Sequence, residues 1–264
     1  MTGLTIVLVE GYDDRAFWSG YLRHVRGCLP SVAVPAARLA GLPPGTHQLL
    51  RQTKGTYTYL SPSDGVVQVI PFQEQHQAGQ EPLRALLHAR LNGRKTRPEA
   101  LRGLVVCTDD DRPAGSPPRH DRAWLVQLLR NAKVTDIPAL AGADTDGVHL
   151  PDGVVVTAVH WRVDLGPDPA LPDQQSLERV ACAALHVVAP ARVASVRTWL
   201  AGLPDLSAGY KDHKATAGAL WAGWSAHDGW ARFYEALWED EPTRAALLEA
   251  LPALESAALI ELLR

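Results

Sequence analysis

Continuous apolar runs alternate with helical periodicities over the first 160 residues of the chain. The run Ile6–Val9 is unbroken rather than alternating, which is typical of a strand buried on both faces of a parallel sheet. Apolar residues from Phe17 to Val25 then recur at three- and four-residue spacing, which predicts a helix. The same patterns predict further strands near 32–34 and at 66–72, 103–108 and 154–159, and helices at 82–91 and 120–131.

This alternation favours the α/β class, with a mostly parallel sheet flanked by helices. The pattern changes after the proline-rich loop 166–172, beyond which every periodic segment predicts a helix. We therefore expect an α/β core over 1–165, with an irregular insertion over about 36–64, and a C-terminal helical region over 170–264 that completes the site. The predicted C-terminal helices cover 174–188, 191–201, 213–224, 228–238 and 243–263, the last with a break near Pro252.

Two of the predicted buried strands end in acidic residues. The first runs into Glu10 and Gly11, followed by Asp13 and Asp14, and the second runs into Asp109–Asp111. If the two strands are neighbours in one sheet, these carboxylates meet at the strand ends, where α/β proteins bind their ligands. A cluster of like charges needs a compensating cation, so the pattern predicts a divalent-metal site.

The aspartates also have structural interpretations, whereas Glu10 is harder to explain without a functional role. Glu10 ends a fully apolar strand, a position that a merely solvated glutamate does not need, whereas Asp14 opens a helix and could cap it. If strand geometry persists, Asp109 and Asp111 point to the same side of the chain and could share a metal ion. Asp110 then points away, to cap a helix or to face solvent. The alternative is a plain acidic loop without a metal. Carboxylates without cysteine or histidine partners favour Mg²⁺ or Mn²⁺ over zinc.

The two acidic motifs resemble those of the Toprim domain, the catalytic fold shared by bacterial primases, type IA and II topoisomerases, small maturation ribonucleases and overcoming-lysogenization-defect (OLD) nucleases. In that family a glutamate follows the first strand, as in Val9–Gly11 here, and metal-binding aspartates follow the second. The resemblance implies that Glu10 is both catalytic and metal-binding. It implies these ligands for Mg²⁺ or Mn²⁺: Glu10, Asp14, Asp109 and Asp111.

A third segment is closest to the OLD branch of the family. Gln175–Glu178 resembles the serine/threonine-leucine-glutamate segment of those nucleases, which implies that Glu178 helps to hold a second metal ion. Lys211 or Lys214 resembles their downstream lysine, which neutralises charge at the scissile phosphate. Without the resemblance, Ser176 and Glu178 form a helix-start pair and the lysines a solvated turn. The sequence does not distinguish Lys211 from Lys214.

The chain also departs from the larger Toprim proteins. Pro113 stands where topoisomerases carry a third acid, and no G-x-x-x-x-G-K-[ST] pattern is present to form the ATPase of OLD nucleases. Three scattered cysteines, Cys28, Cys107 and Cys182, cannot supply the zinc module of primases. The chain therefore resembles a free-standing Toprim protein with a helical tail.

Composition limits the alternatives only modestly. The 264 residues carry a net charge of −3, so the chain has no global basic signature of a nucleic-acid binder, although a local basic patch can coexist with an acidic total. No membrane span, no signal peptide and unpaired cysteines together predict a cytoplasmic protein. Tryptophans at helical spacing in the tail are attributed to core packing or a helix interface rather than to base stacking. Four arginines either line a phosphate path or form a solvated face: Arg112, Arg119, Arg122 and Arg130.

The sequence thus leads to a Mg²⁺- or Mn²⁺-dependent nuclease that hydrolyses phosphodiester bonds in DNA, with RNA as the alternative substrate; the sequence does not reveal which of the two is preferred. One alternative is a non-catalytic module that keeps the acidic site to bind a metal, a nucleotide or a partner protein. Another is primase-like nucleotidyl transfer, which the missing zinc module disfavours. A separate ATPase partner and the oligomeric state stay open, and no membrane partner is expected.

Overall fold

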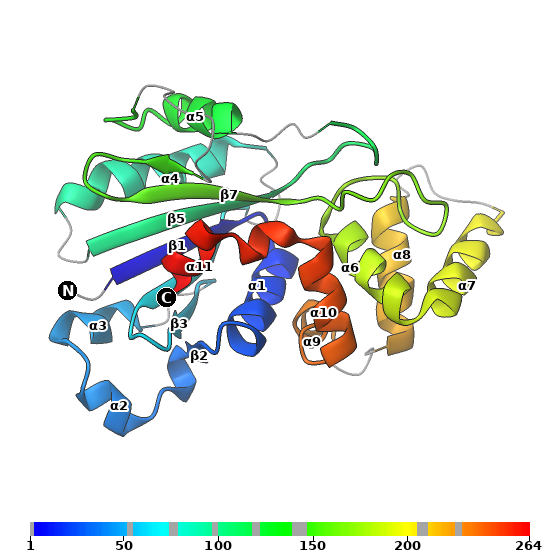
Figure 1. The fold of residues 1–264 in the computed structure, drawn as a ribbon, viewed down its shortest axis with the longest axis horizontal. Helices are drawn as coiled ribbons and strands as arrows, with labels where there is room; N and C mark the ends of the chain where they lie inside the picture. The colour runs from blue at the N-terminus through cyan, green and yellow to red at the C-terminus, as the bar shows by residue number, and fades with distance from the viewer. Residues whose placement is uncertain are drawn as a thin grey trace. The chain divides into compact units, whose positions relative to one another are not determined.

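The computed structural model describes residues 3–51, 55–73, 79–96, 100–117, 122–138, 147–204, 211–224 and 229–264. The chain divides into two compact units that alternate along the sequence (Figure 1). Unit 1 comprises Met1–Cys107, Arg119–Val159 and Ser256–Arg264. Unit 2 comprises Thr108–Pro118 and His160–Glu255.

The strands form one seven-stranded sheet in the order β2-β3-β4-β1-β5-β7-β6. At its centre β1 pairs in parallel with β4 and β5, while the β2/β3, β3/β4 and β6/β7 pairs are antiparallel. The last two residues of β5 and of β7 belong to unit 2. The strands are β1 Gly3–Val9, β2 Leu29–Pro30, β3 Tyr57–Leu60, β4 Val66–Pro71, β5 Ala100–Asp109, β6 Val148–His149 and β7 Val155–Trp161.

Helices of unit 1 cover the two faces of this sheet, which explains the unbroken apolar runs in its central strands. Ile6 and Leu104 share a buried cluster with leucines of α4 and α5. On the other face, the hydroxyl of Thr5 donates to the carbonyl of Leu262 in α11 at 2.6 Å. The helices of unit 1 are α1 Tyr12–His24, α2 Ala36–Ala40, α3 Pro44–Leu49, α4 Glu81–Asn92, α5 Arg122–Asn131 and α11 Ala257–Leu263.

The span from 29 to 64 differs from the sequence-based expectation. The strand predicted near 32–34 is wrong, because Ser31–Ala33 form a 3-10 helix. The strand just before this helix, β2, has two residues. Pro30 and Pro35 bracket this segment and lack the N–H that a longer ladder requires. The stretch interpreted as irregular contains α2, α3 and β3.

Unit 2 is helical, with α6 at its centre. Every residue from Leu177 to Leu185 is buried, because α6 contacts α7, α8 and α10. The predicted α/β class with C-terminal helices is thus confirmed, including the break at Pro252, where a 3-10 helix stands. The helices are α6 Leu177–Val188, α7 Pro190–Ala201, α8 Asp212–Trp224, α9 Trp230–Ala236 and α10 Glu241–Ala250.

The three cysteines are buried and none forms a disulfide. Burial raises the pKa of the Cys28 thiol to about 12, and it raises the pKa of Cys182 as well. Both thiols are therefore protonated at neutral pH, and a protonated thiol is a poor nucleophile and metal ligand.

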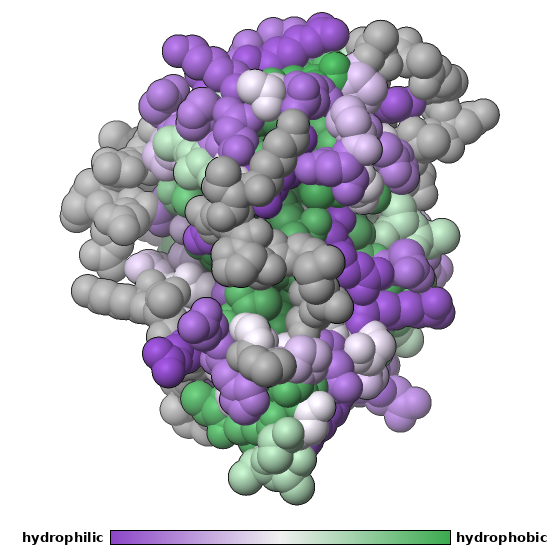
Figure 2. All heavy atoms as spheres, turned by 90° about the vertical axis from the view of Figure 1, so that its left-hand side faces the viewer, coloured by the Kyte–Doolittle hydropathy of each residue, from purple (hydrophilic) through white to green (hydrophobic). Residues whose placement is uncertain are grey.

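Polar side chains predominate in the view of Figure 2, and apolar side chains are exposed between them in smaller areas. Within the described part of the chain, no helix combines the length and the apolar character that crossing a membrane requires.

Candidate functional site

Glu10 follows β1 in unit 1 and is half-buried. The side-chain amide of Gln73 donates to its Oε1 at 2.9 Å, and the backbone N–H of Gln73 donates to its carbonyl oxygen at 3.1 Å. Gln73 lies two residues beyond β4, the strand beside β1, so the sheet itself holds Glu10 in place. Sequence reasoning missed Gln73, because a glutamine after a strand carries no motif.

Asp14 has a structural role at the start of α1. Its Oδ2 accepts a hydrogen bond from the N–H of Gly11 at 3.0 Å, and the side chain is buried. This contact closes the first turn of the helix, where a carboxylate also complements the helix dipole. In the structure Asp14 makes the contact expected of a residue that caps the start of a helix.

The second acidic motif turns as soon as β5 ends at Asp109. Asp111 has a φ of 59°, in the left-handed region, so the expectation that strand geometry continues through this residue is wrong. The reason is a new pairing: the N–H of Asp111 donates to Gln175 at 2.9 Å, and that of Ala114 donates to Asp173 at 2.7 Å. These backbone bonds tie the acidic loop to the segment that precedes α6.

Asp110 is buried, so the expectation that it faces solvent is wrong. Only 1% of its side chain is exposed, and its two oxygens accept from Arg112 and Arg162, each at 2.9 Å. Burial lowers the pKa of Arg162, but hydrogen bonds to Asp164 and Asp110 outweigh it and raise that pKa. Arg112 is thus bound within the protein, whereas Arg119, another candidate for a phosphate path, lies outside the described residues.

Asp109 contacts the N-terminus of α6. Its Oδ1 accepts the N–H of Leu177 at 2.9 Å, and the hydroxyl of Ser176 accepts the N–H of Arg179 at 3.5 Å. The N–H groups of Leu177 and Arg179, at the start of α6, therefore have side-chain acceptors. The positive end of the helix dipole also favours the Asp109 carboxylate.

Glu178, in the first turn of α6, forms an ion pair with Lys214 of α8. The distance from Lys214 Nζ to Glu178 Oε1 is 3.0 Å, and the exposed fractions of the two side chains are 56% and 5%. Burial alone would raise the pKa of Glu178, but the charge and hydrogen bond of Lys214 outweigh it and lower the pKa. The structure thus distinguishes the two lysines: Lys214 contacts Glu178, and exposed Lys211 precedes α8.

His213, which sequence reasoning missed as a site residue, is buried beside these groups. Burial lowers its pKa, with help from Lys214, while Glu178 and Asp111 oppose the shift. The charges of Asp111, in the loop after β5, and of Glu178, in α6, therefore both act on the His213 imidazole. No motif in the sequence distinguishes it from the other histidines.

Three carboxylates of unit 2, those of Asp109, Asp111 and Glu178, lie around the N-terminus of α6, and their hard oxygens suit Mg²⁺ or Mn²⁺. Hydrogen-bond donors hold all three: Leu177 contacts Asp109, Gln174 contacts Asp111 at 2.8 Å, and Lys214 contacts Glu178. Among the described residues, no three Asp, Glu, His or Cys side chains converge on one point as metal ligands would. The donor chemistry fits a divalent cation, which would have to replace these donors.

The ion pair predicts a pH-dependent stability. The folded-state pKa of Glu178 lies below its ordinary value of 4.5, so the pair stabilises the fold above pH 4.5 and this contribution is lost as the pH falls through the lowered pKa. Lys214→Met should therefore lower the free energy of unfolding at pH 7 but much less at pH 3. Urea denaturation in EDTA measures both, and Arg102→Met, which removes the more exposed pair between Arg102 and Glu261, is the control. An equal loss at both pH values would contradict the assignment.

Comparison with known proteins identifies the fold alone. No protein-family model matches the chain, and no curated protein matches it. The structure is similar to the crystal structure of hypothetical protein PH0156 from Pyrococcus horikoshii OT3, with a TM-score of 0.67 and 16% sequence identity. The similarity covers 100% of this chain and 99% of that chain.

Proposed function

We propose that this protein is a Mg²⁺- or Mn²⁺-dependent nuclease that hydrolyses phosphodiester bonds in DNA, with RNA as the alternative substrate. The observation that carries the proposal is the cluster at the N-terminus of α6, where Asp109 contacts the helix and Glu178 is paired with Lys214. These residues are far apart in the sequence, and the Toprim resemblance implies Asp109, Glu178 and one of the lysines Lys211 and Lys214.

In unit 2, Asp109, Asp111 and Glu178 would hold the cation; Glu10 and Asp14 of unit 1 are ligands that the Toprim resemblance alone implies. The cation would polarise a phosphoryl oxygen, lower the pKa of a bound water and offset charge on the leaving oxygen. Asp109 is already fixed by Leu177, and the buried pairs of Asp110 hold the loop that carries it.

Two further side chains contribute in different ways. Lys214 presents an exposed ammonium with three donors, which suits it to bind a phosphate oxygen and to offset the charge that develops there. Glu10 is the proposed general base or acid, a role for which its fixed position beside Gln73 is suited.

Cleavage of supercoiled plasmid tests the proposal. We expect the wild-type protein to nick plasmid in Mn²⁺ and not in EDTA, and Glu10→Ala to lower the rate by roughly a hundredfold or more, as loss of a general base or a ligand does. Circular dichroism checks that the variant is folded. Cleavage at the wild-type rate in both Glu10→Ala and Asp109→Ala would refute the assignment.

A second candidate is a non-catalytic module that binds a metal, a nucleotide or a partner protein. The helix-start contacts of Asp14 and Asp109 favour it, because both carboxylates have a structural use that needs no chemistry. Calorimetric binding of Mn²⁺ without cleavage of plasmid, oligonucleotide or RNA would select this candidate over the nuclease.

A further inference from the structure

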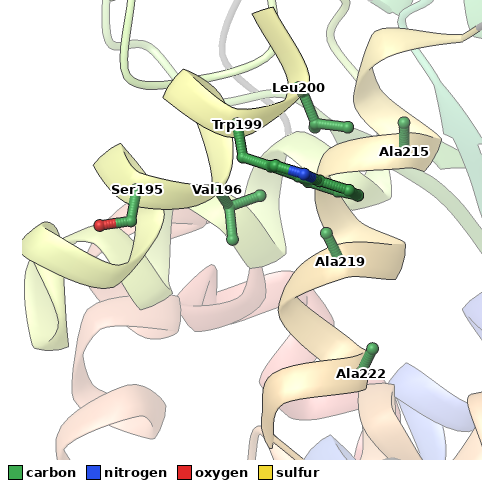
Figure 3. A pocket seen from close by; sticks show the side chains of 7 residues that line it. All are labelled: Ser195, Val196, Trp199, Leu200, Ala215, Ala219 and Ala222. Carbon is green, nitrogen blue, oxygen red and sulfur yellow. The ribbon is translucent and has the colours of Figure 1, made fainter. Parts of the chain in front are cut away.

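A groove of about 560 Å³ lies between α7 and α8 in unit 2 (Figure 3). Its volume is in the range of small-molecule sites, and its lining is almost entirely apolar. Trp199 of α7 is 58% exposed there, which is unusual for so large an apolar side chain. The groove is lined by Val196, Trp199 and Leu200 of α7 and by Ala215, Ala219 and Ala222 of α8.

The shape of the groove follows from the residues of α8. Ala215, Ala219 and Ala222 recur at helical spacing and face α7, and their short side chains leave room beside the indole. In Figure 3 the indole of Trp199 extends from α7 toward α8, between Ala215 and Ala219. The result is an apolar groove with an aromatic surface.

The two helices that form the groove are basic, although the chain has a net charge of −3. Exposed Lys211 directly precedes α8 and lies one helical turn before Ala215, whose N–H donates to the Lys211 carbonyl at 2.9 Å. The one acid, Asp212, is paired with Arg197 of α7. Over α7 and residues 211–224 the four cationic side chains are Arg192, Arg197, Lys211 and Lys214.

Building on the proposed function, we infer that this groove binds a base of single-stranded nucleic acid, stacked on Trp199, with Lys211 and Lys214 contacting the adjoining phosphates. Aromatic side chains stack on any base, and local cations attract the backbone. Bases inside a duplex are already stacked on their neighbours, so the groove favours unpaired strands. Lys214 also contacts Glu178, which links the groove to the proposed cleavage site.

Charge argues against a second copy of the chain as the occupant. Two copies meeting through this groove would bring the same cationic side chains together, and like charges across an interface oppose association. A polyanion with flat apolar groups satisfies both the charge and the shape of the groove.

Fluorescence anisotropy with a short fluorescein-labelled oligothymidylate, in EDTA, tests the inference. Trp199→Leu keeps an apolar side chain but loses the ring, and we expect it to bind the single strand roughly five- to a hundredfold more weakly than wild type. Trp199→Phe should retain most of the affinity, and affinity for a duplex should change little. Leu165→Ala removes another exposed apolar side chain of unit 2 and should have no effect.

Three results would overturn the inference: no binding of the oligonucleotide by wild type, unchanged affinity in Trp199→Leu, or a dimer that Trp199→Leu dissociates while the affinity stays unchanged. Thermal denaturation establishes that each variant is folded. Because the assay contains no metal and measures no cleavage, it separates the two proposals. Binding through Trp199 without any cleavage in Mn²⁺ supports the groove and refutes the nuclease, whereas cleavage without Trp199-dependent binding refutes only the groove.

Discussion

Asp109→Asn is expected to reduce Mn²⁺-dependent cleavage by roughly a hundredfold or more while leaving the fold intact. The asparagine side-chain oxygen still accepts the N–H of Leu177, the contact that Asp109 makes at 2.9 Å, so the N-terminus of α6 stays capped. The substitution removes only the negative charge, and that charge is what a divalent cation binds. Initial rates of plasmid nicking give the effect, and urea denaturation gives the stability.

The matched control is Asp240→Asn in the same unit. Asp240 caps α10 by accepting the N–H of Thr243 at 3.0 Å, the same kind of contact that Asp109 makes to α6. It has no part in the proposed chemistry, so its substitution should leave the cleavage rate unchanged. If Asp109→Asn cleaves as fast as Asp240→Asn, the Asp109 carboxylate is a helix cap only.

Asp110→Ala is expected to lower the free energy of unfolding by about 3 kcal/mol, because it removes the buried carboxylate that two largely buried arginines share, and exposed Asp164 compensates Arg162 only in part. The side chains of Arg162 and Arg112 are only 15% and 26% exposed and lose their shared carboxylate. Without the Asp110 carboxylate, the loop that carries Asp109 and Asp111 is no longer held by the ion pairs with Arg112 and Arg162. Urea denaturation at pH 7 measures the change.

Glu261→Ala provides the comparison for that stability change. Glu261 of α11 pairs with Arg102 at 3.3 Å, but 64% and 38% of the two side chains are exposed. Solvent screens such a pair, so its loss should cost about 1 kcal/mol or less. A loss in Asp110→Ala no larger than in Glu261→Ala would mean that the buried pairs do not stabilise the loop.

The central strands could be predicted because their apolar runs record burial on both faces. Ile6–Val9 and 103–108 fall within β1 and β5, and these strands are parallel neighbours, paired from Gly3↔Ala100 to Leu8↔Val106 with a register shift between Leu4 and Thr5. The short β3 could not be predicted, because four residues between turns carry too little periodicity. The docking of α11 on unit 1 depends on Gly103, where a Cβ would come within 2.2 Å of Leu262.

Within the candidate site, the sequence distinguishes residue types but not their partners. Asp109, Asp110 and Asp111 are identical in type, yet one caps a helix, one is buried between arginines, and one is exposed. Arg162 lies 52 residues from Asp110, and no local pattern connects them. The choice of Lys214 over Lys211 likewise depends on where α8 begins.

Electron paramagnetic resonance of free Mn²⁺ tests the central claim most directly, because binding to the protein removes the signal of the hydrated ion. The account predicts that the wild-type protein lowers this signal and that Asp109→Asn and Glu178→Gln do so much less, while Asp240→Asn behaves as wild type. An undiminished signal with wild type, or equal binding by all four proteins, would contradict a metal site built on Asp109 and Glu178.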